Sequence, residues 1–110
     1  MKKVLITGGA GYLGSVLTEV LLNLGITHVD LFSLDVEGYE LNVIGGVDFN
    51  VIDITYMLVE VNSDDYSLSD MDSLLLSKGF ENIRNISNFT MENTVNWPGN
   101  HQDYLYKKID

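Results

Sequence analysis

A strand-like apolar run, a glycine-rich turn and an amphipathic helix follow one another at the start of the chain. Residues 3–7 are mainly β-branched and aliphatic and stop at Gly8, which is typical of a strand buried on both faces of a parallel sheet. Between Tyr12 and Leu24 apolar residues recur at helical spacing, and Gly25 is placed for a left-handed C-terminal cap. A chain that begins in this way is expected to build an α/β fold.

The rest of the chain continues this alternation of strand-like and helix-like segments. The last predicted helix has Ser67 or Ser69 as its N-cap and ends at Gly79. Because strands separated by helices form right-handed crossovers, we expect a mostly parallel sheet whose final two strands, with no helix between them, form an antiparallel edge. The predicted fold is one small three-layer α/β/α Rossmann-like domain over residues 1–110. Strands are expected at residues 28–34, 54–61, 81–87 and 103–109, and helices at residues 36–44 and 67–78.

Charge and cysteine content exclude several classes of function. The chain has 16 acidic and 6 basic residues, a formal net charge of −10 and no cysteine. Such a surface repels phosphate, so we expect no nucleic acid and no anionic membrane as partner. Without cysteine, no disulfide, thiolate metal site or cysteine nucleophile can form. No apolar run approaches the roughly 20 residues of a membrane span. We expect a cytoplasmic protein with a small-molecule substrate, and the sequence predicts no oligomeric state.

The turn between the first strand and the first helix has the glycine spacing of a phosphate-binding loop. Gly8 permits a tight exit from the strand, Gly11 lets the backbone approach a phosphate, and Gly14 lets helix and strand pack closely. The amides at the start of the helix then offer hydrogen bonds to an anion. The predicted cofactor-binding residues of this loop are Gly8, Gly9, Gly11, Tyr12, Leu13 and Gly14.

These residues resemble the start of the NAD-dependent epimerases and dehydratases, which belong to the extended short-chain dehydrogenase family. The resemblance covers about residues 1–25 and implies a dinucleotide cofactor. An acidic residue about 20 positions after the loop would then bind the adenosine ribose. Asp35 follows Gly14 by 21 positions, and Asp30 is the alternative. The only arginine, Arg84, lies far along the chain, which favours NAD over NADP.

A second resemblance begins near residue 29. Residues 34–40, with the sequence LDVEGYE, resemble the D-x-E-G segment of FkbM-type S-adenosylmethionine-dependent methyltransferases, and the similarity extends over about residues 29–110. It implies that residues 28–110 form the C-terminal half of such an enzyme, which transfers a methyl group from S-adenosylmethionine to a hydroxyl. The family's acidic residue before the glycine loop is missing here, where Thr7 stands, as are the units that would follow the first helix. In that family the first strand lies beside the fourth, so the shortened sheet can still close.

Carboxylates follow the predicted strands at the end where ligands bind in open α/β sheets. Asp35, Glu37 and Glu60 are therefore expected to line one crevice with the glycine loop. Glu60 and Glu37 are the candidate catalytic residues, and Asp35 is expected to face the cofactor. The methyltransferase resemblance implies that Asp35 or Glu60 holds the substrate hydroxyl or acts as general base. Such oxygen ligands also suit Mg²⁺ or Ca²⁺, although we assign no metal site. A structural alternative is that Glu37 and Glu40 only complement the dipole of a short helix.

Three functions stay open at this point. The longer resemblance implies a methyltransferase, the residues of the glycine loop imply an NAD-binding domain of the epimerase or dehydratase type, and the shortness of the chain allows a catalytically inactive fragment.

Overall fold

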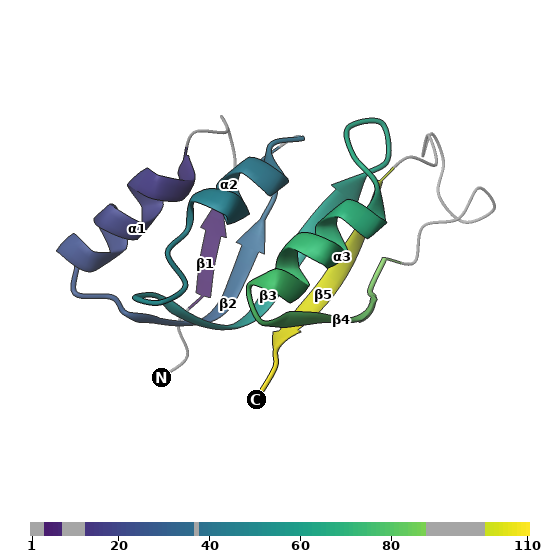
Figure 1. Ribbon diagram of the computed structural model, residues 1–110. Coiled ribbons are helices and arrows are strands. Elements are labelled where there is room, and N and C mark those ends of the chain that lie inside the picture. Colours follow the sequence, from purple (N-terminus) through teal and green to yellow (C-terminus); the bar gives the residue numbers. More distant parts are fainter. Residues whose placement is uncertain (1–3, 8–12, 37, 88–100) are drawn as a thin grey trace.

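In the computed structural model, strands and helices alternate along the chain in the predicted order (Figure 1). The structure describes residues 4–7, 13–36, 38–87 and 101–110, with side chains from residue 17 onward within these ranges. The predicted bounds agree within two residues for every element except the second helix. The elements are β1 (Val4–Thr7), α1 (Leu13–Asn23), β2 (His28–Leu34), α2 (Glu40–Gly46), β3 (Asp53–Asn62), α3 (Leu68–Ser77), β4 (Phe80–Asn85) and β5 (His101–Lys108).

The strands of the described residues form one mixed, five-stranded sheet in the order β1-β2-β3-β5-β4. β1, β2 and β3 pair in parallel, whereas β5 is antiparallel to both β3 and β4. The prediction of a mostly parallel sheet is therefore wrong, since two of the four strand pairings are antiparallel. The reason lies in β5, which pairs with β3 as well as with β4 instead of extending the edge beyond β4. It thus adds two antiparallel pairings rather than one.

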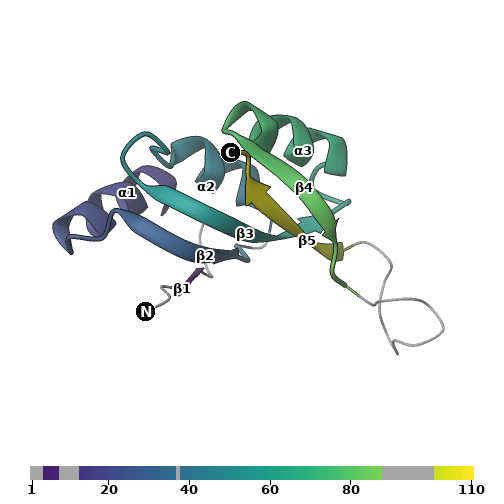
Figure 2. The same cartoon turned by 90° about the horizontal axis from the view of Figure 1, so that it is seen from below.

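The three described helices all lie on one face of the sheet (Figure 2). α1 packs beside α2, and α2 beside α3. The predicted three-layer arrangement is not found, because the described residues form two layers. Each crossover, from β1 to β2, from β2 to β3 and from β3 to β4, moves in the same direction across the sheet. Right-handed crossovers that move in one direction place their helices on the same face, and only a reversal of direction would cover the other.

The hydrophobic core lies between the sheet and this row of helices. Phe32 of β2, Met57 of β3 and Tyr106 of β5 are fully buried there, together with Ile44 of α2 and Leu75 of α3. Burying a large apolar side chain contributes roughly 1.5–3 kcal/mol relative to exposure. Packing of these residues therefore fixes the helices over the strands and holds the strand ends in place.

The ends of the helices follow the local signals in the sequence. Ser67 is the N-cap of α3 in a capping box, in which its hydroxyl accepts a hydrogen bond from the Asp70 N–H at 3.0 Å. Gly25 and Gly79, which follow α1 and α3, have φ angles of 73° and 89°, so the predicted glycine stops are confirmed. In the described part of the chain, no helix has the length and apolar character needed to cross a membrane.

The second helix begins at Glu40 and not at Val36 as predicted. Gly38 has a φ of 96°, which no residue of a right-handed helix adopts. The N–H groups of Val36 and Gly38 are instead hydrogen-bonded by the side chain of Glu40. Residues just after β2 therefore form a loop, and α2 starts only once the chain has turned.

Candidate functional site

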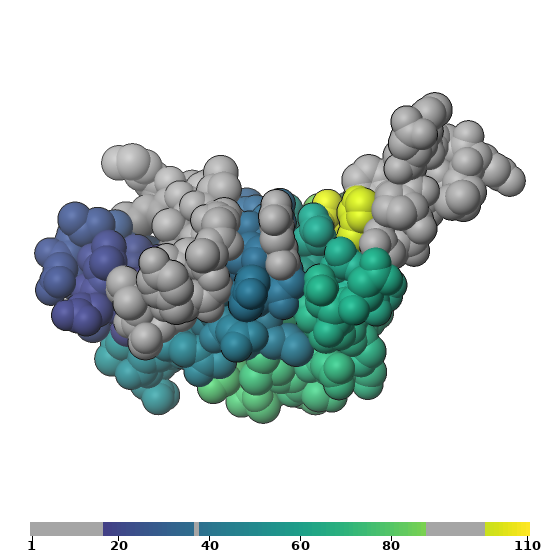
Figure 3. All heavy atoms as spheres, turned by 90° about the horizontal axis from the view of Figure 1, so that it is seen from above, coloured from purple at the N-terminus to yellow at the C-terminus, as the bar shows by residue number. Residues whose placement is uncertain are grey.

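The C-terminal ends of β1, β2 and β3 lie next to one another at one end of the sheet, here called the carboxyl end (Figure 1). Asp35 directly follows β2, and Glu60 lies near the end of β3. Figure 3 looks onto this end, where the segments that follow β2 (blue) and β3 (green-blue) lie beside the start of β5 (yellow). Open α/β sheets bind ligands at this end of their parallel strands, so the carboxyl end is the candidate site.

Three carboxylates gather at the carboxyl end. Glu60 of β3 lies directly opposite Asp103 of β5, and opposite residues of antiparallel strands point to the same face. Partial burial raises the pKa of Glu60 above its ordinary value, and the negative charge of Asp35 raises it further. Asp103 and Glu40 add smaller increases, while His101 lowers this pKa. Burial and then Asp35 also raise the pKa of Asp103. Glu60 and Asp103 therefore hold a proton more readily than isolated carboxyl groups do.

Glu40 is the one acidic side chain of the described residues that is fully buried, with 1% of its surface exposed. Its carboxyl oxygens accept hydrogen bonds from the N–H of Val36 at 2.8 Å and of Gly38 at 3.1 Å. The hydroxyl of Tyr66 lies 2.9 Å from Oε1 of Glu40 and 2.8 Å from the backbone oxygen of Glu60, so one hydrogen serves two acceptors. Burial first, and then the charge of Glu40, raise the pKa of Tyr66 well above its usual range. This hydroxyl therefore stays a donor, and it links the segments that follow β2 and β3.

The same two segments meet at a second point. A Cβ atom on Gly38 would lie 2.8 Å from Oδ2 of Asp65, which is closer than real Cβ contacts come. Because the φ of Gly38 is also positive, this position favours glycine for two independent reasons. The glycine of the D-x-E-G segment thus shapes the loop and lets the segment after β3 approach it.

The structure brings two of the predicted site residues together. Asp35 and Glu60 are close enough for the charge of one to raise the pKa of the other. Leu13 and Gly14 begin α1 after β1, as predicted, although their side chains are not described. Within the described ranges, no group of three or more histidine and acidic residues is arranged to hold a metal ion. Five predicted site residues lie outside the described residues: Gly8, Gly9, Gly11, Tyr12 and Glu37.

Three residues at the carboxyl end were not predicted as part of the site. Asp103 comes from β5, and only the pairing of β5 with β3 places it beside Glu60. Tyr66 lies in the segment between β3 and α3, where no periodic pattern marks it. The structural alternative for Glu40, as partner of a helix dipole, agrees with its place in the first turn of α2. That interpretation is incomplete, because its carboxyl group points back to the loop after β2.

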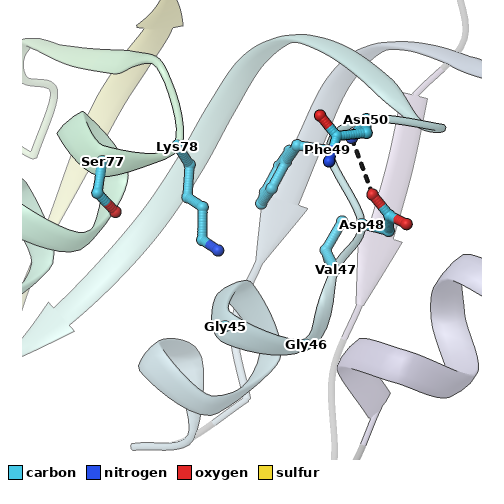
Figure 4. A pocket seen from close by; sticks show the side chains of 8 residues that line it. All are labelled: Gly45, Gly46, Val47, Asp48, Phe49, Asn50, Ser77 and Lys78. Atoms are coloured by element: carbon cyan, nitrogen blue, oxygen red, sulfur yellow. Dashed lines mark hydrogen bonds between the residues drawn. The ribbon is translucent and has the colours of Figure 1, made fainter.

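A hollow of about 490 Å³ lies at the opposite end of the helices, where α2 and α3 finish. Figure 4 shows Lys78 extending into it between Ser77 and Phe49, with its amino group towards the helix end of Gly45 and Gly46. None of the predicted site residues contributes to this hollow. Its lining consists of Gly45, Gly46, Val47, Asp48, Phe49, Asn50, Ser77 and Lys78.

A family model matches the chain over residues 16–81, and its description is methyltransferase FkbM domain. The match begins within α1 and continues into β4, so it starts and ends earlier than the expected residues 29–110. It leaves out the glycine turn, and no comparison supports the dehydrogenase-like resemblance of residues 1–25. No curated protein and no solved structure matches the chain significantly. Because the match covers more than half of the chain, the protein belongs to the FkbM methyltransferase domain family.

Proposed function

We propose that the chain binds S-adenosylmethionine at the carboxyl end and transfers its methyl group to a hydroxyl of a small molecule. Membership of the FkbM family supports a methyltransferase-like function. The proposal of this cofactor and of a hydroxyl acceptor rests on the position of Asp35 and Glu60. These residues lie together at the ends of adjacent parallel strands. This is the end of the sheet at which such folds hold their ligands.

The carboxylates at the carboxyl end fit a cofactor that carries ribose hydroxyls and a positively charged sulfonium. An ionised carboxylate accepts hydrogen bonds from hydroxyl groups, and Asp35 is exposed at the end of β2. The crowded carboxylates Asp35, Glu60 and Asp103 produce a negative potential that attracts a cation. We assign Asp35 to the cofactor, together with the loop residues Gly8, Gly9, Gly11, Tyr12, Leu13 and Gly14.

Glu60 is the residue that we assign as general base. When bound, the cofactor supplies an electrophilic methyl group. A carboxylate whose pKa is raised accepts a proton more readily near neutral pH, and the pKa of Glu60 is raised by burial and by Asp35. Glu60 would take the proton of the acceptor hydroxyl and leave an electron pair on oxygen for the new bond to the methyl carbon. The bond from that carbon to the sulfonium sulfur would break, with its electron pair staying on sulfur. Glu37 is the second candidate for this role.

Isothermal titration calorimetry with S-adenosylhomocysteine, the demethylated cofactor, tests the proposal. We expect S-adenosylhomocysteine to bind and NADH to give no heat of binding. NADH is the appropriate competitor because residues 1–25 resemble a dinucleotide-binding loop. Binding of NADH without any response to S-adenosylhomocysteine would contradict the proposal.

Two substitutions test the assigned cofactor contacts. Asp35→Asn should weaken the affinity for S-adenosylhomocysteine about tenfold, since hydrogen bonds to charged groups are the stronger ones. Asp48→Asn, at the far end of α2, is the matched control and should leave the affinity unchanged. Gly11→Val should abolish binding, whereas Gly45→Val should not, because nothing lies within 4 Å of a Cβ at Gly45. Equal affinities in Asp35→Asn and Asp48→Asn would remove Asp35 from the site.

A further inference from the structure

A continuous path of hydrogen bonds connects the backbone beside Asp35 with that of Glu60. The N–H of Val36, the residue next to Asp35, donates to Glu40 at 2.8 Å. Oε1 of Glu40 lies 2.9 Å from the hydroxyl of Tyr66, and that hydroxyl lies 2.8 Å from the backbone oxygen of Glu60. Two side chains therefore join the two strand ends that carry the proposed cofactor-binding and catalytic residues.

We propose that Glu40 and Tyr66 are positioning residues, which fix the placement of the Asp35 and Glu60 carboxylates relative to each other. This inference rests on the proposed function, in which Asp35 faces the cofactor and Glu60 the acceptor. Glu40 and Tyr66 act through the backbone atoms to which they are bonded. They are not assigned a contact with either substrate.

The chemistry of the pair favours positioning over simple packing. Burying a carboxyl group costs free energy unless hydrogen bonds satisfy its oxygens. An apolar pair of similar size would hold two loops together without that cost. Hydrogen bonds, however, are directional and restrict both distance and angle. The buried Glu40, with two N–H donors and the Tyr66 hydroxyl around it, therefore sets a defined geometry.

A second contact between the same segments supports the inference independently. Gly38, after β2, lies so close to the Asp65 carboxyl group, after β3, that a Cβ atom would fit only if the Asp65 side chain shifted. The two segments thus meet at Gly38 and Asp65 as well as at the hydrogen bond between Glu40 and Tyr66. A loop held at two points cannot rotate freely about either one.

Tyr66→Phe is the sharpest test, because it removes one hydroxyl and keeps the ring. The matched control is Tyr39→Phe, which removes a hydroxyl from the neighbouring loop where 53% of the residue is exposed. The readout is the titration of the Glu60 carboxyl group by nuclear magnetic resonance. In Tyr66→Phe we expect the pKa of Glu60 to fall towards its ordinary value, because Asp35 is no longer held beside it. In Tyr39→Phe the titration should match the wild type. An unchanged Glu60 titration in Tyr66→Phe overturns the inference.

Amide hydrogen exchange at Val36 and Gly38 provides a second readout, with Glu40→Gln as a second variant if Tyr66→Phe does not fold. We expect exchange at both amides to be about tenfold faster in either variant, since a hydrogen-bonded network is partly lost. Exchange rates equal to those of the wild type in both variants would overturn the inference.

Binding of S-adenosylhomocysteine separates this inference from the proposed function. If the wild type binds it, we expect Tyr66→Phe to weaken the affinity about tenfold, with an unchanged far-ultraviolet circular dichroism spectrum. Equal affinity in that variant would make the pair structural only and would overturn the positioning role. If the wild type binds none, the proposed function fails, while the Glu60 titration and the amide exchange still decide whether the pair fixes Asp35 and Glu60.

Discussion

Glu60 and Asp103 stand directly opposite each other on neighbouring antiparallel strands, so that two carboxyl groups occupy one cross-strand pair. Like charges at such positions destabilise a sheet. Burial and the charge of Asp35 raise the pKa of both groups, which means that the folded protein disfavours their ionised forms. Groups with perturbed pKa values concentrate at functional sites. When ionised, the pair therefore opposes folding, and a chemical role explains its presence better than stability does.

Replacing Glu60 by glutamine should stabilise the protein at neutral pH. The pKa of Glu60 is raised on folding, so its ionised form opposes folding above that pKa, and the penalty disappears below its ordinary value of 4.5. We expect the melting temperature of Glu60→Gln to exceed that of the wild type by about 2–4 °C at pH 7. The melting temperatures of the two proteins should become equal as the pH falls below 4.

The control for this substitution is Glu19→Gln, which removes an exposed carboxylate from α1. It should change the melting temperature by less than Glu60→Gln does. A Glu60→Gln protein that melts below the wild type at pH 7 would show that Glu60 forms a stabilising interaction instead.

Substitution of Gly38 tests the loop after β2. Gly38→Ala should lower the free energy of unfolding by about 1–2 kcal/mol, because a positive φ strains residues with a Cβ. Gly25→Ala carries the same backbone penalty, with a φ of 73° and nothing within 4 Å of the added Cβ. Urea denaturation should show a larger loss for Gly38→Ala, and the additional Asp65→Ala change should bring it close to Gly25→Ala. Identical losses in the two single variants would mean that the Asp65 side chain moves away without cost.

The buried hydroxyl of Tyr106 should contribute measurably to stability. It donates a hydrogen bond to Oδ1 of Asp72 at 2.6 Å and so connects β5 with α3. Tyr106→Phe should lower the free energy of unfolding by about 1 kcal/mol, the usual net value of such a bond. Tyr104→Phe is the control on the same strand, where the residue is only partly buried. Equal urea midpoints for Tyr106→Phe and the wild type would contradict this expectation.

His28 should titrate above the usual histidine range. Hydrogen bonds to Asp30 at 3.1 Å and to Asp53 at 2.8 Å raise its pKa above 6.5, and Asp30 has the largest effect. The resulting stabilisation is present below pH 6.5 and is lost as the pH rises through the folded pKa. In imidazole proton titrations, Asp30→Asn should lower the pKa of His28 more than Asp53→Asn does. The reverse order would assign the main effect to Asp53.

The elements of secondary structure could be predicted because their signals are local. The Ser67 capping box and the stops at Gly25 and Gly79 depend only on a few neighbouring residues. The antiparallel pairing of the last two strands was predicted correctly. The layers and the order of the strands in the sheet could not be predicted in this way. Both depend on the direction of each crossover and on which strands pair with β5. The residues of β5 specify neither.

The residues of the candidate site also differ in whether local sequence signals predict them. Asp35 and Glu60 could be predicted, because a position at the end of an apolar strand is visible in the sequence. Asp103 and Tyr66 join them only through strand pairing and through a hydrogen bond across 26 residues to Glu40. The glycine loop, the part with the most specific sequence pattern, lies mostly outside the described residues.

The position of β5 between β3 and β4 also governs the order in which the sheet can assemble. β4 is synthesised before β5, yet among the described strands β5 is the only one that pairs with it. The chain must therefore double back before the earlier strand gains a hydrogen-bonded place, and contacts of such long sequence separation slow folding. Any truncation that removes β5 would leave β4 without a strand partner and β3 as a bare edge, so that the loss of one segment affects two fifths of the sheet.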